Sequence, residues 1–148
     1  MEGLEAFSSL QHLDLDHNKL TNVSVLSQCT NLTELNISYN AIQEIKALSQ
    51  LTNLTSLNCS YNLLTNLPEW PEGSALSILD ASYNEITSVW GLRLLEELTY
   101  VYMDYNKLTN IDAIAGCYRL VMVNVYGNEI SDISKFEDHD IIVNYDPT

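Results

Sequence analysis

An asparagine recurs every 22 residues along this chain, six times in succession, without an insertion or a deletion. The six residues are Asn18, Asn40, Asn62, Asn84, Asn106 and Asn128. Six matches in register are far beyond chance, so the chain is built from repeats. A unit of this length cannot bury its own apolar side and must stack on its neighbours. The sequence therefore predicts a solenoid.

Apolar residues occupy fixed places around each asparagine. Leucine or valine stands five residues before it, another apolar residue stands three before it, and leucine stands eight before it. The unit reads LxxLxLxxNx(L/I)xx(I/V). Alternate residues of a strand point to opposite sides, so stacked units form a parallel sheet with one apolar side. We expect each asparagine side chain to bond backbone groups of adjacent turns.

This motif resembles the leucine-rich repeat over nearly the whole chain, from about Leu4 to Ile142. Its length is similar to the repeats of bacterial internalin-type surface proteins and of the cytosolic phosphatase-regulator type. The resemblance implies an α/β fold: a right-handed leucine-rich-repeat solenoid with a parallel concave sheet and short irregular or helical-turn convex segments. We expect a single domain over residues 1–148, with six full repeats and partial end repeats. The unfinished last repeat favours a piece of a longer protein.

The composition limits the classes of partner that the chain can bind. Twenty acidic and six basic residues give a formal charge of −14. Nucleic acid and anionic membrane surfaces would be repelled, and no apolar run is long enough to span a membrane. The three cysteines, Cys29, Cys59 and Cys117, cannot all pair with one another and are interpreted as small buried apolar side chains. We expect a monomer without a cofactor and with a protein partner.

The outward positions of the concave sheet lie six, four and two residues before each asparagine, and none is Lys or Arg. They are small and polar in the first half of the chain and carry aromatic and methionine side chains in the second. Such side chains are typical anchors of protein interfaces. The predicted partner-binding residues are Ile78, Tyr100, Tyr102, Asp104, Met122, Asn124 and Tyr126. The alternative is that these aromatics pack on further repeats or on a cap.

Two further features concern the turns. Tyr39, Tyr61, Tyr83 and Tyr105 each precede the asparagine of their unit. Identical residues at this spacing are expected to stack along the edge of the sheet. Pro68 and Pro71 lie in the back segment of the third unit. Because proline removes a donor and fixes φ, that segment should be extended rather than helical.

One cluster has the composition of a metal site: His12, Asp14, Asp16 and His17. Alternate residues of an extended strand lie about 7 Å apart, which is too far for one ion without ligands from a neighbouring strand. We interpret the cluster as a solvated face. The sequence also lacks a nucleophile elbow and a phosphate-binding glycine loop, so no enzymatic activity is expected.

The leading hypothesis is a non-enzymatic recognition module that binds a basic or apolar protein partner on its concave face. The internalin-type resemblance implies a bacterial secreted or surface protein, whereas a native start at Met1 would favour the cytoplasm. One alternative is a cytosolic regulatory subunit that docks an enzyme such as a phosphatase. Another is a structural spacer without a ligand, and a carbohydrate or metal binder ranks last.

Overall fold

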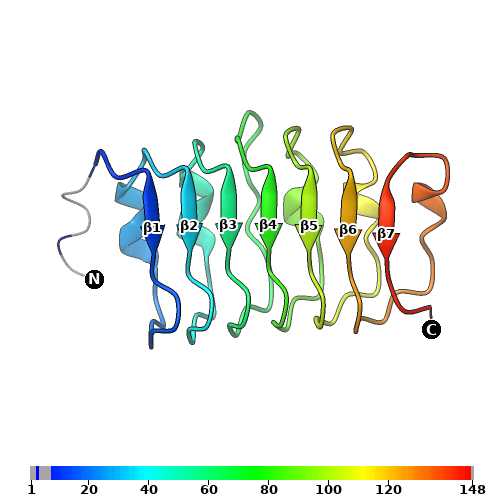
Figure 1. Ribbon diagram of the computed structural model, residues 1–148, viewed down its shortest axis with the longest axis horizontal. Helices are drawn as coiled ribbons and strands as arrows, with labels where there is room; N and C mark the ends of the chain where they lie inside the picture. Colours follow the sequence, from blue (N-terminus) through cyan, green and yellow to red (C-terminus); the bar gives the residue numbers. More distant parts are fainter. Residues whose placement is uncertain (1–2, 4–7, 148) are drawn as a thin grey trace.

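Seven short strands lie side by side in one parallel sheet and follow the order of the chain, with β1 at one end and β7 at the other (Figure 1). The computed structural model describes residue 3 and residues 8–147, so Leu4 lies outside the described part. The strands are β1 (His12–Asp14), β2 (Glu34–Asn36), β3 (Ser56–Asn58), β4 (Ile78–Asp80), β5 (Tyr100–Tyr102), β6 (Met122–Asn124) and β7 (Ile142–Asn144). This is the predicted leucine-rich-repeat solenoid.

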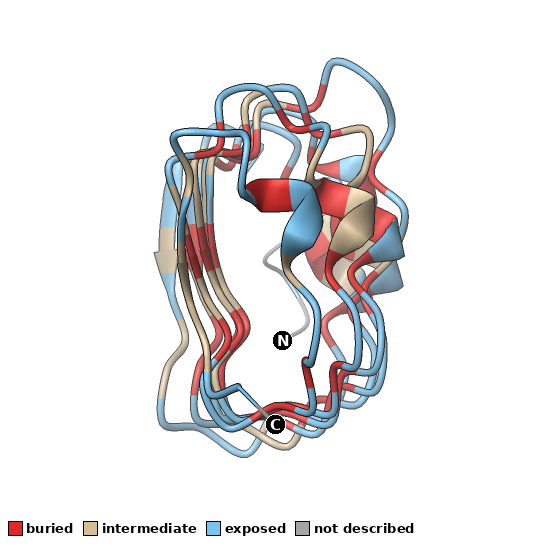
Figure 2. Cartoon of the chain, turned by 90° about the vertical axis from the view of Figure 1, so that its right-hand side faces the viewer, coloured by how far each residue is buried: buried red, intermediate tan, exposed pale blue. Residues whose placement is uncertain are grey.

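Short 3-10 turns form the opposite side of the solenoid (Figure 2). They are η2 (Ser24–Gln28), η3 (Lys46–Gln50), η4 (Trp90–Leu92), η5 (Asp112–Ile114) and η6 (Ser134–Phe136). Each turn buries an apolar side chain, from Leu26 in η2 to Phe136 in η6. The predicted helical-turn segments are therefore confirmed, as 3-10 turns. Within the described residues, no helix has the length and apolar character needed to cross a membrane.

The back of the third unit differs from the others. Residues 67–74, all described by the structure, contain no helical turn, as the two prolines predict. Trp70 occupies the place that Leu48 holds in the preceding unit and is fully buried. Its backbone N–H donates to the oxygen of Gly91 at 3.2 Å. A Cβ at Gly91 would lie 2.2 Å from the backbone oxygen of Pro68, so this close approach requires glycine.

The core lies between the sheet and the 3-10 turns. The central residue of each strand from β2 to β6 is buried in it. Cys29, Cys59 and Cys117 are buried there too, as predicted. Burial raises the pKa of the Cys59 and Cys117 thiols, so both remain protonated apolar side chains.

The repeated asparagines join successive units. The Nδ2 of Asn62 donates to the backbone oxygens of Ile37 at 2.9 Å and Cys59 at 3.1 Å, and its Oδ1 accepts from the N–H of Ile42 at 3.0 Å. Equivalent bonds form at Asn40, Asn84, Asn106 and Asn128. Asn18, in the first unit, is exposed, and its Nδ2 donates to the backbone oxygens of Leu15 and Asp16 in its own unit. The predicted ladder is confirmed for the five inner rungs.

Candidate protein-binding surface

The outward side chains of the strands form rows that run across the sheet, and we call this surface the sheet face. Its first row follows the strand register from one strand to the next. The members are His12, Glu34, Ser56, Ile78, Tyr100, Met122 and Ile142. The row is polar from β1 to β3 and apolar from β4 to β7. We call Ile78, Tyr100, Met122 and Ile142 the apolar row.

Exposure differs within the apolar row. Ile78 is 40% exposed and Ile142 is 56% exposed, whereas Tyr100 and Met122 are half-buried. In contrast, the polar end of the same row contains an exposed contact between His12 Nδ1 and Glu34 Oε2 at 3.1 Å. Large apolar side chains at four consecutive strands form a contiguous surface that water does not favour.

The second row lies two residues further along each strand and continues through Asp80, Tyr102, Asn124 and Asn144. Asn144 Nδ2 donates to Asn124 Oδ1 at 2.7 Å, which ties the last strand to its neighbour. Tyr102 is half-buried between Asp80 and Asn124. This row therefore offers one aromatic ring beside polar and acidic groups.

The third predicted outward column is largely not available to a partner. Its serines, Ser38, Ser60 and Ser82, are buried. The reason is local: Ser38 donates to Asn36 Oδ1 from its backbone N–H at 3.1 Å and from its hydroxyl at 2.7 Å. The same pair of bonds recurs at Ser60, and the N–H of Ser82 donates to Asp80 Oδ1. The expectation of three outward columns is wrong for these serines, since the chain turns inward there.

At the end of the sheet the third column is outward again. Tyr126 is 43% exposed, and its backbone N–H donates to Asp104 Oδ1 at 2.8 Å. Asp146 Oδ2 accepts from the N–H of Gly127 at 2.8 Å. Burial raises the pKa of Asp104, and the negative charges of Asp80 and Asp146 raise it further, against the lowering effect of the bond from Tyr126. The carboxylates of Asp80 and Asp146 therefore both act on Asp104, which holds the backbone of Tyr126.

The structure brings all seven predicted binding residues onto one half of the sheet face. Ile78, Tyr100 and Met122 share the first row, Tyr102 and Asn124 share the second, and Asp104 and Tyr126 lie at the strand ends. Their role in binding remains a prediction. Ile142, Asn144 and Asp146 extend the same half of the face, although they were not among the predicted binding residues. Residues Ile142–Asn144 alternate between outward and inward positions as the other strands do. The 22-residue period does not reveal this, because Ile142 follows Met122 by 20 residues rather than 22.

The basic side chains lie outside the strands, and most of them pair with acidic side chains there. Four of the six form ion pairs: Arg93 with Glu69 at 3.2 Å, Lys107 with Glu85 at 2.9 Å, Arg119 with Glu97 at 2.7 Å and Lys135 with Asp112 at 3.1 Å. The seven strands contain no Lys or Arg. The sheet face therefore has no positive charge of its own from Lys or Arg to balance its carboxylates.

The tyrosines that precede the asparagines stack, as predicted. Ring centroids lie 4.2 Å apart for Tyr39 and Tyr61, 4.1 Å for Tyr61 and Tyr83, and 4.6 Å for Tyr83 and Tyr105. His17 extends the stack at 4.1 Å from Tyr39, which the sequence analysis did not foresee. All five residues have positive φ, between 50° and 56°.

This geometry indicates a structural role for the ring stack. Each inner ring has both faces covered by its neighbours, so solvent meets mainly ring edges and hydroxyl groups. The hydroxyls of Tyr83 and Tyr39 raise the pKa of Tyr61. A shallow groove of about 550 Å³ runs beside the stack, lined partly by Tyr39, Tyr61 and Leu63. Flat ligands such as sugars stack on free ring faces, and inside this stack those faces are occupied.

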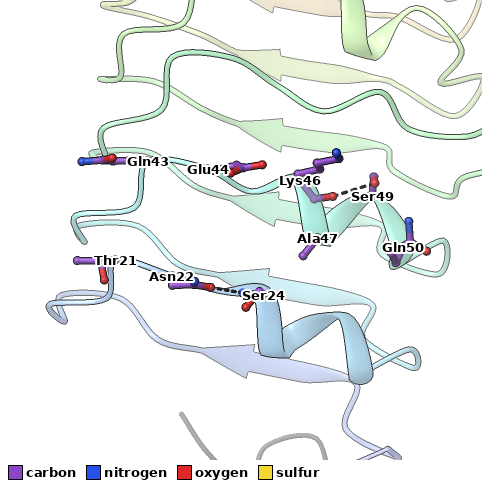
Figure 3. Close-up of a pocket in the computed structure, with 9 residues that line it drawn as sticks. All are labelled: Thr21, Asn22, Ser24, Gln43, Glu44, Lys46, Ala47, Ser49 and Gln50. Atoms are coloured by element: carbon purple, nitrogen blue, oxygen red, sulfur yellow. Dashed lines mark hydrogen bonds between the residues drawn. The ribbon is translucent and has the colours of Figure 1, made fainter.

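A second shallow groove, of about 530 Å³, lies beside η2 and η3 (Figure 3). Its nine lining residues are mostly small or polar, and none is Cys or His. Inside it, Asn22 Oδ1 accepts from the N–H of Ser24 at 2.7 Å, and the Ser49 hydroxyl donates to the oxygen of Lys46 at 2.9 Å. These groups stabilise the local turns. The groove has no nucleophile paired with a base.

The cluster with metal-like composition is divided. His17 Nδ1 lies 2.6 Å from Asp16 Oδ2, and this contact lowers the pKa of Asp16, whereas His12 pairs with Glu34. Over the part of the chain that the structure describes, no three His, Cys, Asp or Glu side chains are grouped to hold a metal ion.

Comparisons with known proteins agree with this geometry. A family model for two copies of the leucine-rich repeat matches residues 8–45 and 30–72. The remaining units continue the same geometry through β7. The chain therefore resembles leucine-rich-repeat proteins over the matched residues, and its fold continues the same repeat geometry beyond them. No curated protein sequence matched the chain.

Solved structures place the repeats among internalin-type proteins. Internalin C2 from Listeria monocytogenes superposes with a TM-score of 0.85 and 25% identity, over 98% of this chain and 75% of that chain. The functional domain of InlJ from the same species superposes with a TM-score of 0.82 and 28% identity, over 94% of this chain and 30% of that chain. A leucine-rich-repeat protein from Leptospira interrogans superposes with a TM-score of 0.86 and 23% identity, over 95% of this chain and 38% of that chain. At this identity the similarity supports the fold alone. The chain thus resembles bacterial internalin-type repeats.

Proposed function

We propose that this chain is a non-enzymatic module that recognises a protein partner with the β4–β7 half of its sheet face. Leucine-rich-repeat proteins bind protein partners, and internalin-like proteins are typically recognition modules. The observation that carries the proposal is the apolar row, which is surface that a monomer leaves in contact with water. Aromatic and methionine side chains in such a row have the composition of binding hot spots.

The proposed partner contacts are the seven residues of the sequence analysis together with Ile142. Tyr100, Met122 and Ile78 supply apolar area, and Tyr102 and Tyr126 add a ring and a hydroxyl each. Asp104 and Asn124 support the site, since Asp104 holds the backbone of Tyr126 and Asn124 is joined to Asn144. A bacterial secreted or surface location is part of the proposal, and it is supported by the similarity to internalin-type proteins.

A capture experiment with matched variants tests the proposal. The baits are the wild-type chain, a Tyr100→Ala/Tyr102→Ala/Tyr126→Ala triple variant, and Trp90→Ala as the control. Trp90 is 56% exposed and lies in η4, on the side opposite the sheet. The proposal predicts a partner that the wild type and the control retain and the triple variant loses, while circular dichroism shows all three folded.

The alternatives give other results in the same experiment. A structural spacer captures no partner with any bait. A regulatory subunit captures an enzyme, and the activity of that enzyme changes when the wild-type chain is added. A partner that all three baits retain equally would contradict binding through the sheet face.

A further inference from the structure

The apolar row has a regular spacing. Its four side chains lie on adjacent parallel strands at equivalent positions, since Ile78 is opposite Tyr100, Tyr100 opposite Met122, and Met122 opposite Ile142. Neighbouring strands are about 4.8 Å apart, so the row is about 14 Å long. It runs across the strands, along the axis of the solenoid (Figure 1).

We propose that the apolar row seats an amphipathic helix of the protein partner, which lies along the solenoid axis and carries basic side chains on its flank toward Asp80, Asp104 and Asp146. This inference rests on the proposed function, because it names the segment that the sheet face recognises.

The spacing favours a helix over an extended segment. Side chains on one face of a helix recur at about 5.4 Å per turn, close to the distance of about 4.8 Å between strands. Side chains on one side of an extended segment recur at about 6.7 Å. Over the three intervals of the row, a helix departs from the strand spacing by about 2 Å and an extended segment by about 6 Å. A helix of about three turns can therefore place one apolar side chain against each strand.

The acidic side chains lie to one side of the apolar row and determine which flank of the helix is basic. Asp80 follows Ile78 by two residues within β4, which places it about 7 Å along the strand from the row. Asp104 lies on the same side of the row, two residues past the end of β5. A helix with its side chains is about 10–12 Å across, so a helix centred on the row extends about 5–6 Å to each side and ends close to Asp80. Long basic side chains on that flank point toward Asp104 and Asp146. Asp104 and Asp146 each hold a backbone N–H with one oxygen. With no Lys or Arg in the strands, a basic flank meets uncompensated negative charge.

Three synthetic peptides test the inference. The first is a helix of about 18 residues with leucine at i, i+4, i+7 and i+11 and arginine along one flank. The second replaces those arginines with glutamate. The third has the composition of the first, with its leucines in an alternating, strand-like pattern. Calorimetry at low salt should show the first binding at least tenfold tighter than either of the others. Its advantage over the second should shrink as salt rises from about 0.05 to about 0.5 M.

Variants of the chain assign the contacts. Tyr100→Ala/Met122→Ala should lower the affinity for the first peptide at least tenfold. Asp80→Asn/Asp104→Asn should remove most of the salt dependence of that affinity. Trp90→Ala should leave the affinity unchanged. Equal binding of the three peptides, preference for the strand-like peptide, or no binding of the first at about 1 mM would each overturn the helix. If the partner of the capture experiment is still lost by the triple variant, the proposed function stands and only the helical segment is refuted.

Discussion

The side-chain amide of Asn84 donates a hydrogen bond to the backbone oxygen of Cys59, 25 residues earlier and one unit away, at 3.1 Å. The same amide also donates to Ala81 of its own unit at 3.1 Å, and its Oδ1 accepts from the N–H of Leu64 at 2.9 Å. One buried side chain therefore joins the turns of two units. An apolar replacement would leave buried backbone groups without partners.

Asn84→Ala should lower the free energy of unfolding by about 3 kcal/mol or more, because it leaves several buried polar groups unsatisfied. Asn18→Ala is the control. Asn18 is exposed and its side-chain amide donates to Leu15 and Asp16 of its own unit, so a loss of about 1 kcal/mol or less is expected. Urea unfolding followed by circular dichroism measures both. Equal losses would show that the asparagines do not act by joining units.

Gly91→Ala should destabilise the protein by about 2 kcal/mol or more, because the new Cβ would meet backbone atoms of Pro68 that cannot rotate away. Gly116→Ala is the matched control. A Cβ there meets nothing within 4 Å, so its effect should be neutral or slightly stabilising. Thermal unfolding of the two variants checks this pair. A tolerated Gly91→Ala would mean that the irregular back segment moves aside freely.

Tyr61→Ala should cost about 2 kcal/mol, since Tyr61 stacks on both Tyr39 and Tyr83. Tyr61→Phe keeps the ring and removes only the hydroxyl, and should stay within about 0.5 kcal/mol of wild type. Chemical unfolding distinguishes the two. If the phenylalanine variant were as unstable as the alanine variant, the hydroxyl groups rather than the stacked rings would stabilise this edge.

The pH dependence of stability should be opposite for two aspartates. Burial raises the pKa of Asp104 above its ordinary value of 3.8, so its ionisation destabilises the fold as the pH rises through the raised pKa. Asp104→Asn should therefore gain stability relative to wild type between about pH 3 and pH 6. The hydrogen bonds from Ser134 lower the pKa of Asp132, so Asp132→Asn should instead lose relative stability as the pH rises toward neutrality.

Unfolding free energies at several pH values measure both effects as differences from wild type. Because each comparison uses the same background, the titration of carboxylates that do not interact with the replaced aspartate cancels. Parallel pH profiles for Asp104→Asn and Asp132→Asn would contradict the opposite environments that the structure gives these two side chains.

Much of the fold could be predicted because the repeat fixes it. The spacing of the asparagines gives the number of stacked units, and the LxL columns give the buried side of every strand. The stack of Tyr39, Tyr61, Tyr83 and Tyr105 was predictable for the same reason, as identical residues at one-unit spacing become neighbours. The prolines at 68 and 71 correctly predicted a back segment without a helical turn.

The remainder depends on local hydrogen bonds and on the last unit. Ser38 and its counterparts are buried because an Asn or Asp two residues earlier bonds them, and periodicity cannot show which way such a side chain turns. Ile142 was not among the predicted binding residues because the last unit is two residues shorter, which moves it out of the column of Met122. The 20-residue offset became visible only in the strand register.

The affinity of the captured partner for three forms of this chain tests the central claim most directly. The forms are the wild type, the Tyr100→Ala/Tyr102→Ala/Tyr126→Ala triple variant, and Trp90→Ala, all shown to be folded. We predict at least a 100-fold loss of affinity for the triple variant, since truncating hot-spot aromatics costs about 2 kcal/mol or more each, and no change for Trp90→Ala. Unchanged affinity of the triple variant would contradict recognition through the β4–β7 half of the sheet face.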